Sequence, residues 1–382
     1  MTWEFQAALL SRLGATGVEC EELLRYNENV FDFGALAPRL PLPDEPFVAT
    51  WEAWAAEARG RGAGGAIAVL AEHLPQLRFP IREGMSGTEA YQAATRRGVP
   101  PATLPAATGL PLARPELVEL TLHASPAGRI PVLTVRGRAE FVALVQALGH
   151  RNEPYPVPES QGALMLSGYN NWSRIAAHKR EWEARPAAER QGSWGEEFAR
   201  LQARRELYQD RFILLSDGPY SAVPAADLGL DDASWRELSL ALRRDHECAH
   251  YFTRRLFGAM RNNLLDELIA DYAGMVGAIG RFRADWFLRF LGLEAFPRCR
   301  PDGRLTIYRG TPPLSEGAFR ILQGLTREAA LNVERFDAAL PPGPRSLAER
   351  ALALTALAAL RLEDIAAPGG DEALARAYRQ IR

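Results

Sequence analysis

Apolar residues recur at helical spacing, three or four positions apart, in several stretches near the N-terminus. Residues 3–14 and 47–58 show this spacing, and the sequence GGAIAVLAEHLPQL (64–77) continues it. The sequence SGTE, residues 86–89, has the form of a capping box and predicts a helix through residues 90–98. The first hundred residues are therefore expected to be mainly helical.

The hydrophobic period then changes. Residues 117–124 and 129–137 are rich in Val, Leu, Ile and Thr, and the short SPAG turn between them predicts two paired strands. Residues 138–149 return to helical spacing and end at a glycine. The sequence RFILLSD, residues 211–217, predicts one more short strand.

The rest of the chain reads mainly as helices. One is expected from residue 233 to residue 257, where Gly258 would end it, and the next over residues 262–280. Helices separated by Pro- and Gly-marked turns follow from residue 315. We therefore predict an α+β fold, with a mainly helical region and a small sheet preceded by a mixed α/β region.

The Pro-rich, polar stretch at residues 150–162 is the best candidate boundary between these regions. It places a mixed α/β N-terminal region at 1–155 and a mainly helical region at 156–382. A surface connector explains the stretch, and the alternative is that Arg151, Asn152 and Glu153 reach into a cleft.

Composition excludes several function classes. The chain has 382 residues, is 47% hydrophobic and carries a formal net charge of -2, so we expect neither a nucleic-acid partner nor an anionic membrane. The longest apolar run, 351–360, is shorter than the roughly 20 residues that cross a bilayer. Three scattered cysteines do not form a disulfide framework, and the N-terminus does not read as a secretory signal. A cytoplasmic protein is the expectation, and its oligomeric state stays open.

The sequence DHECAHYF contains the pattern His-Glu-x-x-His. His246 and His250 are four residues apart, so a helix presents both on one face and the two can bind one metal ion. Glu247 follows about 100° further round the helix and can approach the open coordination position without being a ligand. The alternative is a helix with two hydrogen-bonded histidines.

The next helix offers a second polar pair in an apolar setting. Glu267 and Asp271 are four residues apart in NLLDELIADYAG, and the apolar residues around them have core spacing. Ionisable groups on an apolar helix are costly unless they are paired or bind a metal. The short connection through Gly258 makes the two helices antiparallel neighbours, so the polar faces can meet.

The pair HECAH and DELIAD resembles the gluzincin metallopeptidases, the thermolysin-like and aminopeptidase-like zinc enzymes, over residues 235–280. The resemblance implies that His246, His250 and Glu267 bind Zn²⁺. It further implies that Glu247 is the general base and that Asp271 orients a ligand histidine.

The resemblance also has departures. No histidine follows His250, so a downstream histidine for the oxyanion is absent, and Tyr308 is either its replacement or an ordinary strand residue. By analogy, the small sheet containing residues 211–217 lies beside the active-site helix, and its edge binds an extended peptide.

The function that this implies is a zinc-dependent hydrolase that cleaves a peptide or amide bond, acting on a dedicated intracellular substrate. Two alternatives stay open. One is a non-haem iron oxidase on the same ligands, although a second E-x-x-H, as in helical di-iron proteins, is not found after residue 250. The other is a non-catalytic metal-binding or scaffold protein.

Overall fold

The computed structural model describes residues 3–34, 39–190, 192–261 and 263–382. It divides into two compact units. The helical unit comprises Met1–Pro43, Ser125–Ala127 and Gly218–Arg382, and the sheet unit comprises Asp44–Ala124 and Gly128–Asp217. The sequence-based division is a single cut after residue 155, and it stays a prediction. Helices and one small mixed sheet confirm the α+β fold class.

The four-stranded sheet has the order β1-β2-β4-β3. Its strands are β1 (Val118–Ser125), β2 (Gly128–Val135), β3 (Ala163–Asn170) and β4 (Gln209–Ser216). β2 pairs in parallel with β4, and β3 pairs with β4 in antiparallel fashion. The three predicted strands are confirmed, and β4 lies inside the sheet, so β1 and β3 are the edges.

Strand β3 was not predicted, and its burial explains why. Only Leu166 among its residues is buried, so the strand lacks the alternation that marks a strand with one covered face. A register shift between Ser167 and Tyr169 interrupts it further. The polar second half of the strand therefore resembles a turn in the sequence.

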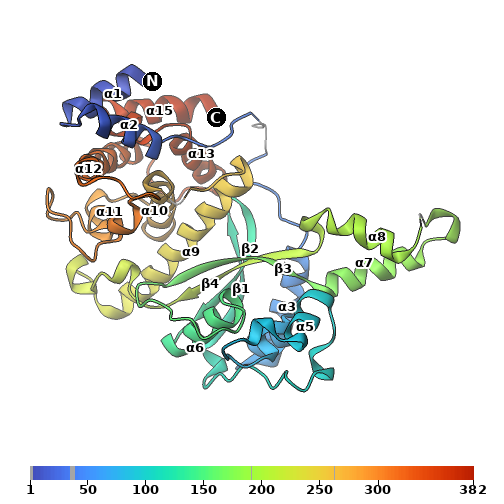
Figure 1. The fold of residues 1–382 in the computed structure, drawn as a ribbon. Coiled ribbons are helices and arrows are strands. Elements are labelled where there is room, and N and C mark those ends of the chain that lie inside the picture. The colour runs from blue at the N-terminus through green and yellow to red at the C-terminus, as the bar shows by residue number, and fades with distance from the viewer. Residues whose placement is uncertain (1–2, 35–38, 191, 262) are drawn as a thin grey trace. The chain divides into compact units, whose positions relative to one another are not determined.

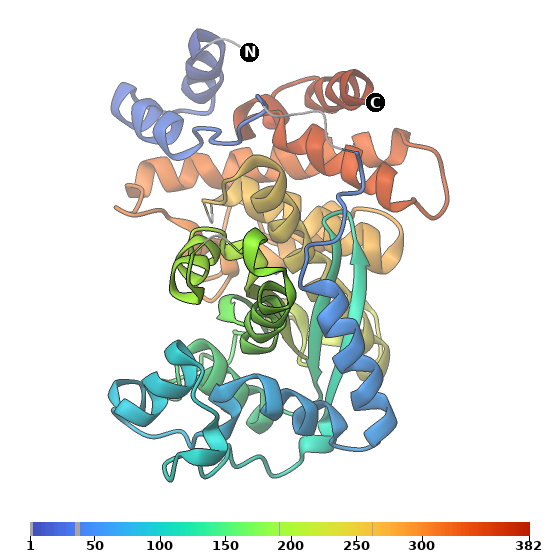
Figure 2. The ribbon, with the colours of Figure 1, turned by 90° about the vertical axis from the view of Figure 1, so that its right-hand side faces the viewer.

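Several helices cover the sheet and extend from it. They are α3 (Val48–Arg61), α4 (Gly65–His73), α5 (Glu89–Arg97), α6 (Arg138–Leu144), α7 (Trp172–Ala184) and α8 (Trp194–Gln202). Helix α3 runs alongside β2 (Figure 2), and its buried Trp51 and Trp54 join the core of the sheet unit. The indole nitrogen of Trp51 donates to the buried Asp210 carboxylate at 2.7 Å.

The predicted capping box at Ser86 is wrong. Ser86 lies in a 3-10 turn, Met85–Gly87, and helix α5 begins only at Glu89. Thr88 is the residue at the N-cap, and its hydroxyl accepts a hydrogen bond from the backbone amide of Tyr91 at 3.3 Å. Of the two hydroxyl residues in SGTE, only the one directly before the helix has the extended backbone that a cap requires.

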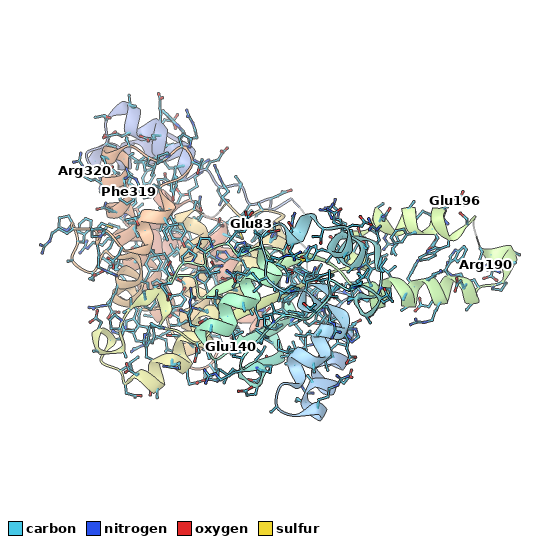
Figure 3. The ribbon with its side chains drawn as sticks, turned by 60° about the horizontal axis from the view of Figure 1, so that its bottom comes forward. Glu83, Glu140, Arg190, Glu196, Phe319 and Arg320 are labelled. Carbon is cyan, nitrogen blue, oxygen red and sulfur yellow. The ribbon has the colours of Figure 1, made fainter. Side chains whose placement is uncertain are left out.

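Helices α7 and α8 form a hairpin that extends away from the sheet (Figure 1). Arg190 and Glu196 are labelled toward its far end in Figure 3. His178 on α7 faces Glu197 on α8, with 2.8 Å between Nε2 and Oε1. His178 thus connects the two helices.

The helical unit contains the remaining helices. They are α1 (Trp3–Arg12), α2 (Gly17–Tyr26), α9 (Asp232–Phe257), α10 (Leu264–Ile279), α11 (Ala284–Leu291), α12 (Glu316–Ala339), α13 (Leu347–Ala358), α14 (Leu362–Ala366) and α15 (Gly370–Ile381). No helix in the described ranges is long and apolar enough to cross a membrane.

Helices α9 and α10 carry the residues predicted to form a site, and local signals define their ends. The Asp231 side chain caps α9 by accepting from the amide of Ser234 at 2.9 Å, and Gly258, with φ 68°, ends it. Asn263 caps α10. A Cβ on Gly274 of α10 would lie 2.7 Å from the carbonyl oxygen of Leu242, so this glycine allows the two helices to approach closely.

Two short 3-10 helices complete the surroundings of the site. They are η8 (Tyr220–Ala222), just before α9, and η10 (Arg304–Tyr308). The interpretation of Tyr308 as a strand residue is therefore wrong. The stretch after α11 forms turns instead, with glycine and proline on both sides of η10.

Buried polar pairs attach α14 to the N-terminal helices. Gln6 donates to Asp364 at 3.2 Å, and the Asn27 amide nitrogen donates to Glu363 Oε1 at 2.8 Å. Within the described residues, Glu363 Oε2 and Asn27 Oδ1 have no hydrogen-bond partner. Burial raises the pKa of Glu363 to about 7, against weaker lowering by the Asn27 hydrogen bond and the charge of Arg361.

Candidate metal centre

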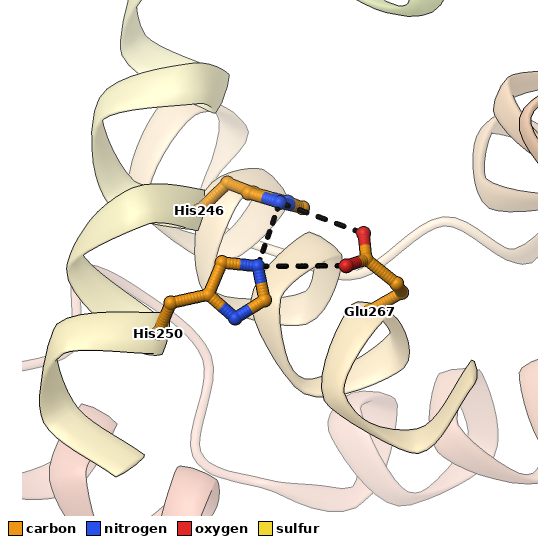
Figure 4. Close-up of side chains that lie close together, drawn as sticks. All are labelled: His246, His250 and Glu267. Atoms are coloured by element: carbon orange, nitrogen blue, oxygen red, sulfur yellow. Dashed lines mark hydrogen bonds and ion pairs between the residues drawn. The ribbon is translucent and has the colours of Figure 1, made fainter. Parts of the chain in front are cut away.

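Three predicted ligands converge between α9 and α10 (Figure 4). His246 and His250 project from successive turns of α9, and their Nε2 atoms lie 3.1 Å apart. Glu267, in the first turn of α10, places Oε2 at 3.6 Å from Nε2 of His246 and Oε1 at 3.6 Å from Nε2 of His250. All three side chains are buried, and among the described residues they form the cluster that could hold a metal ion.

The two separations of 3.6 Å fit a metal ion better than they fit hydrogen bonds. Ligand atoms at about 2.0–2.1 Å from a tetrahedral ion lie about 3.3 Å from one another, close to the three distances here. A separation of 3.6 Å is too long for a hydrogen bond between the carboxylate and either ring. Glu267 Oε2 is buried without a hydrogen-bond partner among the described residues. Arg304 Nη2 lies 3.9 Å from this oxygen and supplies one positive charge, and a metal ion bound by the three side chains would supply more.

Asp271, one turn after Glu267, contacts His246 at Nδ1, the ring nitrogen that does not face the cluster. Its Oδ1 lies 2.9 Å from His246 Nδ1. The Tyr220 hydroxyl donates to the same oxygen at 2.5 Å and lies 2.9 Å from His246 Nδ1. A proton held on Nδ1 leaves the lone pair of Nε2 facing His250 and Glu267, as metal binding requires.

Arg304, at the start of η10, completes this network. It donates to Asp271 Oδ2, and its Nη1 donates to Tyr220 Oη at 3.0 Å and to Ser221 Oγ at 3.1 Å. Ser221 and Ala222 have φ values of 52° and 56°, an uncommon conformation for residues that carry a Cβ. The turn thus holds two oxygen atoms toward the guanidinium at some cost in backbone strain.

The pKa shifts of Asp271 and His250 agree with this arrangement, whereas for His246 burial is outweighed by the hydrogen bond and charge of Asp271, which raise its pKa. Burial opposes ionisation of Asp271, but the charge of Arg304 and the hydrogen bonds from His246 and Tyr220 lower its pKa to about 2. Burial, followed by the charge of His246, lowers the pKa of His250 to about 4. His250 is therefore neutral at pH 7, which is the form that binds a metal.

Glu247 lies next to the cluster but is not part of it. Its side chain is only half-buried, whereas the three ligands and Asp271 are buried. Burial also raises the pKa of Glu247. Cys248, on another face of α9, is buried, and burial raises the pKa of its thiol.

Tyr308 lies near Glu267 at the other end of η10. Burial is the main cause that raises the pKa of Tyr308, and the negative charge of Glu267 raises it further. The backbone carbonyl of Tyr308 accepts from the Tyr26 hydroxyl at 2.7 Å, and that hydroxyl accepts from the amide of Leu264 at the start of α10. Tyr308 is therefore held beside the third ligand.

Tyr220 and Arg304 are the residues that sequence reasoning missed. Tyr220 lies in the Pro-marked loop before α9, and Arg304 lies 54 positions after His250 by residue number. Neither belongs to a motif with His-Glu-x-x-His. The only signal in the sequence is that the loop residues GPYS come shortly before the helix that carries His246 and His250.

The fold and the cluster together define an α+β protein with a buried histidine–histidine–carboxylate centre that could hold a metal ion. The chain belongs to a family of unknown function, DUF7005, whose family model matches residues 8–369. No curated protein matches the chain, and no solved structure matches it.

Proposed function

We propose that the protein is a zinc-dependent hydrolase that cleaves a peptide or other amide bond. The observation that carries the proposal is the convergence of three buried side chains, with Glu267 Oε2 3.6 Å from His246 Nε2 and Oε1 3.6 Å from His250 Nε2, beside the glutamate of a His-Glu-x-x-His helix. The resemblance to gluzincins supports the same conclusion. Two histidines and a carboxylate are a donor set that catalytic zinc uses.

His246, His250 and Glu267 would bind the ion, and residues around them would transfer or retain protons. Bound zinc polarises a carbonyl oxygen and makes water a nucleophile near neutral pH. Glu247 accepts the proton of the attacking water at its carboxylate and gives it to the leaving nitrogen as the amide bond breaks. Asp271 retains the proton on His246 Nδ1, so that Nε2 stays a ligand.

The first experiment measures the metal content of the purified protein by elemental mass spectrometry. About one zinc ion per chain is expected, lost in His246→Ala. His178→Ala is the matched control, because it removes a histidine that also faces a glutamate but is not part of the cluster. Zinc in wild type and in the control, but not in His246→Ala, supports the proposal. No bound metal after added zinc contradicts it.

The donor set also favours one second candidate. Two histidines and one carboxylate bind iron in non-haem oxygenases, so the protein would be an oxidase if iron were the metal found. The same measurement distinguishes the two candidates by the identity of the ion.

The role of Glu247 is tested separately. Glu247→Gln keeps a side chain of similar shape but removes the base, so the variant should retain zinc and lose about 10²–10⁴-fold in turnover on any peptide that the wild type cleaves. Turnover equal to wild type would show that Glu247 is not the base.

A further inference from the structure

The sheet unit contains a cavity of about 520 Å³ that shares no residue with the metal centre. Helix α5, the segment after the π-helix Val145–Gly149, and the edge strand β3 contribute to its lining. Its volume is within the range of about 300–1,000 Å³ that small-molecule sites occupy. All the lining residues lie within the sheet unit.

A rigid loop presents Arg151 to this cavity. Asn152 and Glu153, the next two residues, are buried. The Asn152 amide donates to two backbone carbonyl groups at 2.8 and 3.0 Å, and the Glu153 carboxylate accepts from two backbone amides at 2.8 Å each. Of the three residues considered for a cleft, only Arg151 lines the cavity.

The backbone of this loop is in an uncommon conformation. Arg151 and Asn152 have φ values of 55° and 63°, in the left-handed region that disfavours residues with a Cβ. On the opposite wall, β3 contains an irregularity at Gly168, between Ser167 and Tyr169. Strained backbone and bulged edge strands both concentrate at binding sites.

The lining carries positive charge only. It includes Arg96 and Arg151, and none of the described lining residues is Asp or Glu. Both arginine side chains are exposed, and neither guanidinium has a hydrogen-bond or ion-pair partner in the described part of the chain. Each lies close enough to Tyr91 for its charge to oppose the effect of burial, which raises the pKa of that tyrosine.

Two neutral polar groups in the lining are also unsatisfied. The Tyr91 side chain is 4% exposed, and its hydroxyl has no hydrogen-bond partner among the described residues. The same holds for the side-chain oxygen of Gln76, which is buried. A native structure rarely leaves such groups without a partner, so a bound molecule is the natural source of both hydrogen bonds.

We propose that this cavity binds a small organic anion, a carboxylate or phosphate ester that also carries a hydroxyl or amino group. Arg151 and Arg96 bind the anionic oxygen atoms, for which a planar guanidinium is well suited. The Tyr91 hydroxyl donates to the ligand, and Gln76 accepts from its hydroxyl or amino group. The site is independent of the metal centre and does not rest on the proposed hydrolase activity.

Isothermal titration calorimetry on the full chain tests this site. The probes are glycerol 3-phosphate and malate, with glycerol as the neutral comparison, at constant ionic strength. At least one of the two anions should bind, and glycerol should not. Arg151→Gln should weaken binding by about tenfold or more, since it removes a charge-assisted hydrogen bond.

Two further variants separate a built site from general attraction to positive charge. Tyr91→Phe removes only the hydroxyl and should weaken binding several-fold. Arg180→Gln, at an exposed arginine of α7 outside the lining, should leave binding unchanged. The proposal is overturned if neither anion binds, if Arg151→Gln binds as tightly as wild type, or if Arg180→Gln loses as much affinity as Arg151→Gln.

Discussion

Replacing Asp271 by Asn should weaken both the fold and the metal centre, and a second buried carboxylate allows the two effects to be separated. Asp337 accepts a hydrogen bond from Tyr272 at 2.8 Å and pairs with Arg345, much as Asp271 pairs with Tyr220 and Arg304. No histidine contacts Asp337 in the described part of the chain. Asp337→Asn is therefore a matched control.

The expected loss of stability is similar in the two variants. The side chains of Arg304 and Asp271 are 15% and 0% exposed, and those of Arg345 and Asp337 are 9% and 3% exposed. Breaking a buried pair by removing one charge costs about 3–5 kcal/mol, because the remaining arginine is left uncompensated. Urea unfolding with a chelator present measures this cost without a contribution from metal.

The expected effect on metal affinity differs. Asp271→Asn should weaken zinc binding by about 10–100-fold, or about 1.4–2.8 kcal/mol, because the carboxylate that orients His246 is lost. Asp337→Asn should leave zinc affinity unchanged. Competition titration against a zinc chelator measures both values. An equal loss of zinc affinity in the two variants, or no loss in Asp271→Asn, would refute the role of Asp271 in orienting His246.

Two further predictions concern packing and protonation in the helical unit. Gly274→Ala should lower stability by about 1–3 kcal/mol and weaken zinc binding, because the added Cβ would lie 2.7 Å from the carbonyl oxygen of Leu242 and push α10 away from it. Gly324→Ala in α12 is the control, because an added Cβ there would have no atom within 4 Å, and it should be neutral or stabilising. Glu363 has a pKa of about 7 in the folded protein against an ordinary value of 4.5, so between pH 4.5 and pH 7 it keeps a proton that the unfolded chain releases. Stability should therefore fall by up to about 3 kcal/mol as the pH rises through this range, and Glu363→Gln should remove this pH dependence. Urea unfolding at several pH values checks the second prediction. A Glu363→Gln variant whose stability falls with pH as steeply as that of wild type would contradict it.

The sequence predicted much of the site because its main signals are local. Hydrophobic spacing and Gly258 defined two successive helices, and these signals depend on residues within a few positions of one another. Once the helices were defined, four-residue spacing placed His246 with His250 and Glu267 with Asp271 on common faces.

Only the tertiary structure could add Tyr220 and Arg304, since each comes from a 3-10 turn outside the two helices. The same is true of strand β3, which depends on β4 for its pairing rather than on its own pattern. The tertiary structure also decided that Arg151 lines a cavity, whereas the side chains of Asn152 and Glu153 form hydrogen bonds with the backbone.

One physical reason explains why the sequence predicted the two helices but not the residues around them. A helix satisfies its backbone hydrogen bonds within a short segment, so its position and its faces can be read from neighbouring residues. A hydrogen bond from Arg304 to Asp271, or a cavity between a helix and an edge strand, depends on chain segments that meet only after folding. The sequence therefore determined the ligand helices, and the tertiary structure determined the polar groups that surround them.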